Sequence, residues 1–187
     1  SIRHVQAVIL FLLILLAFLI IYGAYLAYLP FLMERRFQAS SWEIGLTMSA
    51  MSLATALTSS QLGNLARRFR ADALLPVACV CYALALAAMP LLPTIGSLIV
   101  PVVILGIGQG LSIPGLQTLL ASRAPLAHRG AFMAVNGVAL RLGQTLGPML
   151  MGMVYGRWGV DGTFYAAAMV AVGMLGLTIV LVSQREG

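Results

Sequence analysis

The strongest constraint on the fold is a series of long apolar stretches that recur along the whole chain. About twenty apolar residues are enough for a helix to cross the hydrocarbon core of a bilayer. Only 9% of the 187 residues are charged and 61% are hydrophobic, whereas about a quarter of the residues of a typical soluble domain are charged. We therefore predict an all-α integral membrane protein, a single bundle over residues 1–187 with six transmembrane helices at about 5–33, 44–65, 73–92, 95–120, 130–155 and 162–182.

Turn and cap signals separate the predicted spans. Ser40 precedes Glu43 by three positions, which is the spacing of a capping box at a helix start. Pro90 and Pro93 separate the third span from the fourth, and Asp161 stands where it can cap the sixth. The first apolar run is longer than the core of a signal peptide, so we expect it to be a retained span.

The arginines predict the orientation of the spans, because cytoplasmic loops carry an excess of positive charge. One side holds only three arginines, diluted by three acids: Arg35, Arg36, Arg157, Glu34, Glu43 and Asp161. The other side holds seven: Arg3, Arg67, Arg68, Arg70, Arg123, Arg129 and Arg185. We expect a multi-pass protein of the cytoplasmic (inner) membrane with both termini in the cytoplasm. Because the positive charge lies in clusters between apolar runs, it favours membrane topology over a nucleic-acid partner.

An arginine interrupts the fifth predicted span. Arg141 lies twelve residues past Arg129, roughly 18 Å along a helix that rises 1.5 Å per residue, near the middle of a core about 30 Å thick. A charge facing lipid there costs on the order of 3 kcal/mol or more. We expect Arg141 to line a cavity and to bind an anionic or polar group, or to pair with a carboxylate. The alternative is an arginine satisfied by helix-end carbonyls or by an acid on another helix, although no Asp or Glu lies deep in a predicted span.

The residues around Arg141 divide into two faces on a helical wheel of 100° per residue. Polar or kinkable positions lie within about 60° of it: Gly137, Gln144, Thr145, Pro148 and Gly152. The opposite face is a strip suited to close helix packing, formed by Ala139, Gly143, Gly147 and Met151. Asn136 and Gln144 flank Arg141, and we expect them to orient it and to take part in substrate binding.

Tyrosines in the first span are further candidates for a substrate cavity. Tyr22 and Tyr25 offer flat apolar surface with a hydroxyl group, which suits amphipathic substrates. An aromatic belt at the outer membrane interface is an equally good interpretation for both. For Tyr28 we favour the belt.

The fourth span carries a cluster of glycines beside a polar side chain. Gln109 is a candidate for substrate binding, with an interhelix hydrogen bond as the alternative. In the second span we expect Ser52 and Thr55 to bond to carbonyls of their own helix. Close helix packing is our preferred interpretation of the three glycines, Gly106, Gly108 and Gly110.

Two segments resemble a known transporter family. The segment "APLAHRGAFMAVNGVALRLGQTLGPMLMG" resembles the connection into the eleventh helix, and that helix, of major facilitator superfamily transporters. The segment "SSWEIGLTMSAMSLATALTSSQLGNLARRF" resembles the eighth helix of that family with its flanking loops. The order of the predicted spans also resembles one six-helix half of that family, so the resemblance extends over nearly the whole chain. The chain is similar to the C-terminal half, with the N-terminal half as the alternative.

The matching positions in these segments imply roles in packing or gating. Gly143, Gly147 and Pro148 match a Gly-x-x-x-Gly-Pro motif of the family. Gly63 and Arg68 match the loop signature Gly-x-x-x-Asp-Arg-x-Gly-Arg-Arg. The signature is weakened, because arginines replace its Asp and its second Gly and the last two basic positions are Ala71 and Asp72. An anchoring role for this arginine cluster is our preferred interpretation.

The resemblance implies transport of small molecules by alternating access. The segments are similar to those of drug-efflux members, which exchange substrate for protons. Such a half, itself a 3+3 inverted repeat, encloses only half of a substrate cavity. We therefore expect the chain to need a complementary six-helix half or a second copy. The alternative is a non-transporting membrane scaffold or regulatory subunit.

The sequence gives little support to other classes of function. An intramembrane hydrolase needs a serine, a histidine or an acid pair within the membrane, but the chain has no GxSxG motif and no histidine within a span. A GxxxxGK nucleotide loop is excluded because the chain has no lysine. His4 and His128 have no second metal ligand nearby. We therefore predict a protein that is not an enzyme and has no cofactor and no metal site.

Overall fold

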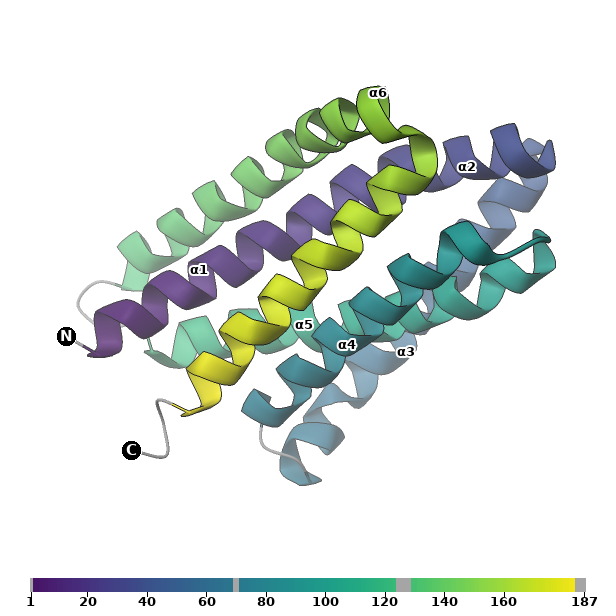
Figure 1. Ribbon diagram of the computed structural model, residues 1–187. Helices are drawn as coiled ribbons and strands as arrows, with labels where there is room; N and C mark the ends of the chain where they lie inside the picture. The colour runs from purple at the N-terminus through teal and green to yellow at the C-terminus, as the bar shows by residue number, and fades with distance from the viewer. Residues whose placement is uncertain (1, 69–70, 124–128, 184–187) are drawn as a thin grey trace.

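A computed structural model describes residues 2–68, 71–123 and 129–183, and all regular structure in these ranges is helical (Figure 1). The longer elements are α1 (Ile2–Ile20), α2 (Ala27–Phe37), α3 (Ser41–Arg68), α4 (Ala71–Ala88), α5 (Ile99–Arg123) and α6 (Arg129–Ser183). Three short elements complete the described chain: the π-helix η1 (Ile21–Leu26) and the 3-10 helices η2 (Met89–Leu91) and η3 (Gly96–Leu98).

The elements α1, η1 and α2 form one continuous helix. The π turn ends at Leu26, whose carbonyl would bond to the N–H of residue 30 in a regular α-helix. Residue 30 is proline, which has no N–H, so the regular hydrogen-bond ladder is interrupted at this point. The helix then ends where Gln38 adopts a left-handed conformation with φ 51°.

The longest helix, α6, contains a sharp bend. Gly159 has φ 70° and ψ −170°, a left-handed backbone conformation that L side chains rarely adopt. The bend divides α6 into a first arm, residues 129–158, and a second arm, residues 160–183, which runs back along the bundle (Figure 1).

Four segments of the described chain are long and apolar enough to cross a membrane: Val5–Phe37, Ala73–Leu91, Gly96–Ser122 and Arg129–Ser183. The predicted spans 5–33, 73–92 and 95–120 each correspond to one of them, whereas 130–155 and 162–182 lie on the two arms of α6. The span predicted at 44–65 lies within α3, which is not among the four. The all-helical membrane class is confirmed, and the number of six spans stays a prediction.

Glycines bring the helices into backbone contact. A Cβ added to Gly106 of α5 would lie 2.6 Å from the carbonyl oxygen of Met51 in α3, and one added to Gly108 would lie 3.0 Å from the carbonyl oxygen of Ala78 in α4. Gly110 likewise meets Thr55 of α3. The expectation of close packing for these glycines is confirmed, and it places α5 between α3 and α4.

Hydroxyl groups join the same helices. Thr55 donates from Oγ1 to the carbonyl oxygen of Gly106 at 3.1 Å, and Ser59 donates to that of Gly110 at 3.3 Å. The expectation that Thr55 bonds within its own helix is therefore wrong, because the glycine brings a carbonyl of the neighbouring helix within reach. Ser52 does bond within its helix, to the carbonyl of Met48.

The predicted capping box at the start of α3 is present. The Ser40 N–H and hydroxyl donate to Oε2 of Glu43 at 2.8 and 2.7 Å, and the Glu43 N–H donates to the Ser40 hydroxyl at 3.4 Å. Hydrogen bonds from the Ser40 backbone and side chain lower the pKa of the Glu43 carboxyl. The capping box therefore stabilises the start of α3 most strongly when the Glu43 carboxyl is ionised.

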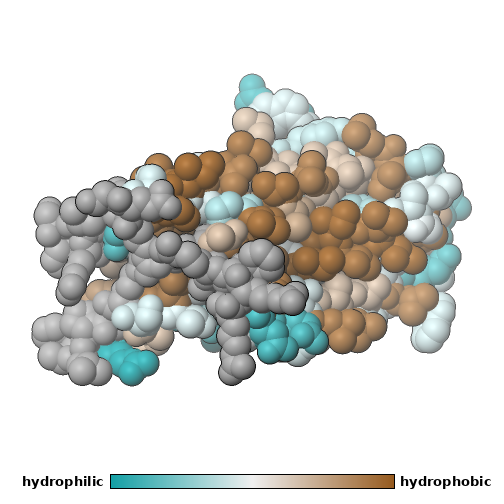
Figure 2. All heavy atoms as spheres, turned by 90° about the horizontal axis from the view of Figure 1, so that it is seen from below, coloured by the Kyte–Doolittle hydropathy of each residue, from teal (hydrophilic) through white to brown (hydrophobic). Residues whose placement is uncertain are grey.

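The surface shows where lipid is the expected environment. In Figure 2 a broad band of hydrophobic residues covers the middle of the face in view, and hydrophilic residues lie at its right-hand end and along its lower edge. Large apolar side chains are exposed along α4 and along the second arm of α6, among them Val80, Leu84, Met169, Val172 and Ile179. Such continuous apolar faces fit a hydrocarbon environment.

Candidate functional site

The first arm of α6 has one packed face and one open face, as the helical wheel predicted. Ala139, Gly143, Gly147 and Met151 are buried. A Cβ added to Gly143 would meet the carbonyl oxygen of Leu15 and would lie 2.9 Å from Cβ of Phe18. This backbone contact with α1 turns the opposite face of the arm, which carries the exposed Arg141, away from α1.

Arg141 lies in an open groove on this outer face. The groove has a volume of about 470 Å³, and every residue that lines it belongs to the first arm: Ala134, Gly137, Val138, Arg141, Leu142, Thr145 and Leu146. The lining is mostly apolar, with a guanidinium and a hydroxyl as its polar groups. This combination is typical of small-molecule sites, which are largely hydrophobic with a few placed polar groups.

Among the described residues, Arg141 bonds to the side chain of Gln144 and to no acid. Its Nη1 donates to Oε1 of Gln144 at 2.9 Å. The acids whose side chains are described, Glu34, Glu43 and Asp161, all lie near helix ends. In the described ranges the one salt bridge joins other residues, so the Arg141 charge is not neutralised within this part of the chain.

Asn136 and Gln109 do not join this group. Oδ1 of Asn136 is buried and has no hydrogen-bond partner among the described residues, and no hydrogen bond connects Asn136 to Arg141 in that part of the chain. Asn136 stands about 140° from Arg141 on the helical wheel, which places it toward the packed face. Gln109 is half-buried on α5 and forms no part of the groove lining. Of the polar groups predicted to surround Arg141, the structure brings only Gln144 into contact with it.

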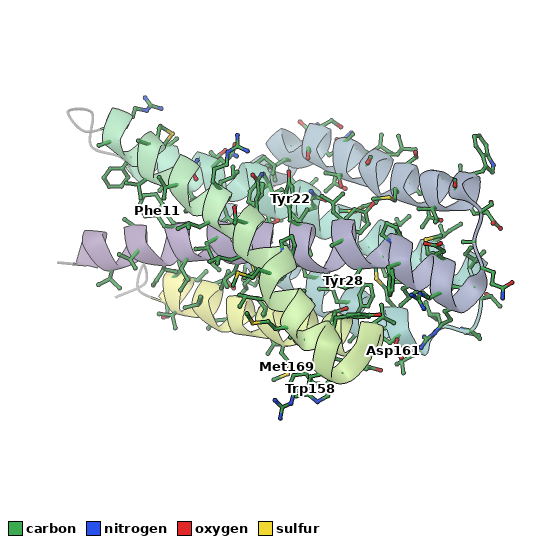
Figure 3. All side chains as sticks on the ribbon, turned by 90° about the horizontal axis from the view of Figure 1, so that it is seen from above. Phe11, Tyr22, Tyr28, Trp158, Asp161 and Met169 are labelled. Carbon is green, nitrogen blue, oxygen red and sulfur yellow. The ribbon has the colours of Figure 1, made fainter. Side chains whose placement is uncertain are left out.

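The tyrosines occupy different environments. Tyr25 is 4% exposed, and its hydroxyl donates to the carbonyl oxygen of Met48 in α3 at 3.4 Å. Tyr22 is half-buried, with its ring stacked on Phe18 at 6.1 Å between centroids. Figure 3 shows Tyr22 and Tyr28 at different positions along the same helix. Tyr25 thus serves contact between η1 and α3, while Tyr22 retains exposed surface.

Tyr28 belongs to an aromatic cluster toward the end of the bundle. Its ring centroid lies 5.5 Å from that of Tyr155, which in turn meets Phe31 edge-on at 5.4 Å. Arg35 lies over the Phe31 ring at 4.9 Å. An arginine over an aromatic cluster fits the membrane interface, in keeping with our interpretation of Tyr28.

The residues assigned to packing or gating are only partly in contact with other helices. Gly143 and Gly147 pack on α1, whereas Pro148 is exposed within α6. A Cβ added to Gly63 would meet no atom within 4 Å in the described structure. The side chain of Arg68 lies outside the described residues, as do those of the other arginines in its cluster, so the expected anchoring role stays a prediction.

An ion pair at one end of the bundle was not predicted from the sequence. Arg36, near the end of α2, donates to Oδ2 of Asp161 at 2.6 Å and to the carbonyl oxygen of Pro90 at 2.5 Å. Asp161 was expected to cap the second arm of α6, but its carboxylate bonds to Arg36 instead. Figure 3 shows Asp161 at the bend of α6, close to Trp158. The available signal was the placement of opposite charges at span ends on the same predicted side.

A comparison with known families decides what kind of protein this arrangement belongs to. The profile described as Major Facilitator Superfamily matches residues 6–187. The chain belongs to the major facilitator superfamily. Membership points to a membrane transporter and not to a typical enzyme, and it confirms the family expected from the Gly-x-x-x-Gly-Pro segment.

Relatives with similar sequences include an uncharacterized transporter, a resistance protein and an efflux pump. The chain is 31% identical over 151 residues to the uncharacterized transporter YebQ of Escherichia coli (strain K12). This aligned region covers 77% of the chain and 33% of YebQ. It is 26% identical over 155 residues to the class D tetracycline resistance protein of Salmonella ordonez, covering 81% of the chain and 39% of the relative. The multi-drug resistance efflux pump PmrA of Streptococcus pneumoniae is 38% identical over 64 residues, covering 34% of the chain and 16% of PmrA. The chain thus spans no more than about two fifths of these relatives.

Proposed function

We propose that the chain is one six-span half of a secondary active transporter that exports small molecules by alternating access and needs a complementary half. The observation that carries this proposal is the combination of a family match over residues 6–187 with coverage of only 33% of YebQ and 39% of the tetracycline resistance protein. In such folds the substrate lies near the midplane between two bundles. One bundle therefore supplies one wall of the site.

The exposed faces of two helices support a missing partner. The outer face of α3 carries exposed serines at positions 49, 52 and 60, and the outer face of the first α6 arm carries Arg141. Such groups are unfavourable against lipid. Large apolar side chains are exposed on all four elements, including Leu53 and Leu57 of α3 and Met149 and Met153 of the first α6 arm, so the polar groups are what distinguish α3 and this arm. We infer that α3 and the first arm of α6 face water or the complementary half.

Helix lengths support six spans. At 1.5 Å per residue, the 28 residues of α3 extend about 42 Å, enough to cross the core despite the polar composition. The two arms of α6 count as two further spans because the bend at Gly159 reverses the chain. With six spans, the arginine distribution supports an orientation with both termini in the cytoplasm, and we propose the inner membrane as the location.

Efflux and proton coupling rest on the relatives. PmrA and the class D tetracycline resistance protein are named as an efflux pump and a resistance protein, and we carry export to this chain on that basis. A proton-coupled exchanger needs a titratable group in the membrane. The acids with described side chains lie near helix ends, so we assign the coupling carboxylate to the complementary half.

Reconstitution tests the proposal. Proteoliposomes with an imposed pH gradient would contain the chain alone, the chain with the complementary half, or that pair with Arg141→Ala. Tetracycline and ethidium serve as probes, followed by fluorescence. We expect gradient-dependent flux only with both halves and wild-type Arg141. Full flux from the monomeric chain alone would overturn the proposal. The proposal would also fail if the pair showed no flux and neither probe raised its melting temperature, and this second result would favour a scaffold.

A further inference from the structure

The groove on the first arm of α6 holds two hydrogen-bond donors one helical turn apart. The Arg141 guanidinium and the Thr145 hydroxyl both line it, and the remaining lining residues are apolar side chains or glycine. Both side chains are exposed. The free donors are therefore concentrated at one place on an otherwise apolar surface.

Neither group forms all of its possible hydrogen bonds with the residues that the structure describes. A guanidinium has five N–H donors, and one hydrogen bond, to Oε1 of Gln144, is formed by Arg141 in the described structure. Helical threonines commonly bond to the carbonyl four residues earlier, as Thr47 and Thr118 do here. The Thr145 hydroxyl has no such bond, nor any other to the described part of the chain. Two neighbouring donors thus point to an acceptor that the described chain does not supply.

The charge of that acceptor follows from the surroundings of Arg141. Gln144 offers a neutral oxygen, so it satisfies a donor without compensating the charge. Arg141 lies roughly 18 Å along the helix from Arg129, where uncompensated charge is costly. Hydrogen bonds from a guanidinium to an anionic oxygen are about twice as strong as neutral ones. The groove therefore favours an anionic acceptor over a neutral or cationic one.

The size and lining of the groove describe the rest of the ligand. The groove is open, has a volume of about 470 Å³ and is lined by one helix arm, so a ligand there lies along the helix surface and is not enclosed. Val138, Leu142 and Leu146 form an apolar side of the groove. A ligand that fits both features has a charged head and an apolar body.

We propose that this groove binds an amphipathic organic anion, whose carboxylate or sulfonate accepts hydrogen bonds from Arg141 and Thr145 while its apolar body packs along Val138, Leu142 and Leu146. The inference rests on the proposed transport function, for which it names the substrate class. It also concerns binding alone, because one arm of one helix lines the whole groove. The purified chain is therefore sufficient for the test.

Two dyes with a shared xanthene core and opposite charge provide the probes. Fluorescein, an anion at pH 8, and rhodamine 6G, a cation, would be titrated against the chain in a neutral detergent, with anisotropy as the readout. The variants are Arg141→Gln and Thr145→Val. Arg157→Gln is the matched control, because Arg157 is exposed on the same arm and lies over the Trp158 ring at 5.8 Å, outside the groove. Thermal unfolding of each variant verifies folding.

We expect wild-type chain to bind fluorescein at least tenfold more tightly than rhodamine 6G. Arg141→Gln should weaken fluorescein binding about tenfold, as expected for loss of a charged hydrogen bond, and leave rhodamine 6G binding unchanged. Thr145→Val should weaken fluorescein binding several-fold, and Arg157→Gln should change it less than twofold. If Arg141→Gln fails to fold, the Thr145→Val result decides.

Three results would overturn the inference. The first is equal or tighter binding of the cationic dye. The second is displacement of fluorescein by phosphatidylglycerol but not by phosphatidylcholine, which would assign the groove to a lipid headgroup. The third is unchanged dye binding by Arg141→Gln together with loss of co-purification with the complementary half, which would assign Arg141 to a carboxylate there. Anion binding without flux in proteoliposomes would contradict only the transport function, and flux without charge preference would contradict only this inference.

Discussion

Gly23 and Gly147 touch through their backbones. A Cβ added to Gly23 would lie 2.7 Å from the carbonyl oxygen of Gly147, and one added to Gly147 would lie 2.9 Å from the amide nitrogen of Gly23. The contact joins the π turn of the first helix to the first arm of α6. With Gly143 packed one turn away on Leu15 and Phe18, it fixes which face of the arm remains open. The position of Arg141 on the outer surface follows from this contact.

Gly147→Ala should destabilise the protein because the added methyl group has no space at the contact with Gly23. Forcing extra methyl groups into a packed interface typically costs about 1–3 kcal/mol. Gly173→Ala is the matched control, since a Cβ there would meet no atom within 4 Å and alanine favours helix over glycine by about 1 kcal/mol. Thermal unfolding in detergent should show a lower midpoint for the first variant only. Equal midpoints would contradict the close contact.

Arg141→Ala should abolish coupled transport by the complete protein and leave expression largely intact. The side chain is exposed and makes its one described hydrogen bond with Gln144, so its removal takes no contact from the core. Radiolabelled or fluorescent substrate flux checks the effect, with membrane abundance measured by immunoblot. Arg157→Ala provides the comparison on the same arm. Normal flux with Arg141→Ala would rule out a role in the substrate cavity.

Arg36→Gln should lower stability modestly, because the Arg36 guanidinium links the end of α2 to η2 and to the bend of α6. Both side chains of the ion pair are partly exposed, at 34% for Arg36 and 40% for Asp161, so the pair itself contributes roughly 0.2–1 kcal/mol. A double-mutant cycle with Asp161→Asn should show non-additive loss in the free energy of unfolding. Arg35→Gln, at the neighbouring position, should not couple to Asp161. Strict additivity for Arg36 would indicate that the pair contributes nothing.

The capping box at Ser40 and Glu43 should make stability depend on acid pH. Since the folded protein holds the pKa of Glu43 below its ordinary value of 4.5, the stabilisation is complete above the unfolded pKa and is lost as the pH falls through the folded pKa. The difference in melting temperature between wild type and Glu43→Ala should therefore be constant from pH 7 to 5 and shrink below pH 4.5. Glu34→Ala controls for loss of an exposed acid. A difference that grows on acidification would contradict the box.

Local rules predicted much of this protein correctly. Apolar stretches of about twenty residues determine the membrane class, because backbone polar groups in lipid must be bonded within a helix. The periodicity of 3.6 residues per turn determined the two faces around Arg141, and the spacing of Ser40 and Glu43 determined the capping box. The Gly-x-x-x-Gly-Pro segment led to the right superfamily. Each of these depends on neighbours within a turn or a single helix.

Contacts between distant helices were decided by the tertiary structure alone. Thr55 bonds to Gly106 because a glycine exposes a carbonyl on another helix, and Asp161 pairs with Arg36 because two span ends meet in space. The Tyr25 hydroxyl donates a hydrogen bond to the Met48 carbonyl for the same reason, and this bond occupies the group that we had considered for substrate binding. A polar group takes the nearest partner with good geometry, and the sequence does not state which helix will be nearest. The sequence placed Arg141 at mid-helix, and the packing of Gly143 and Gly147 decided that it faces outward.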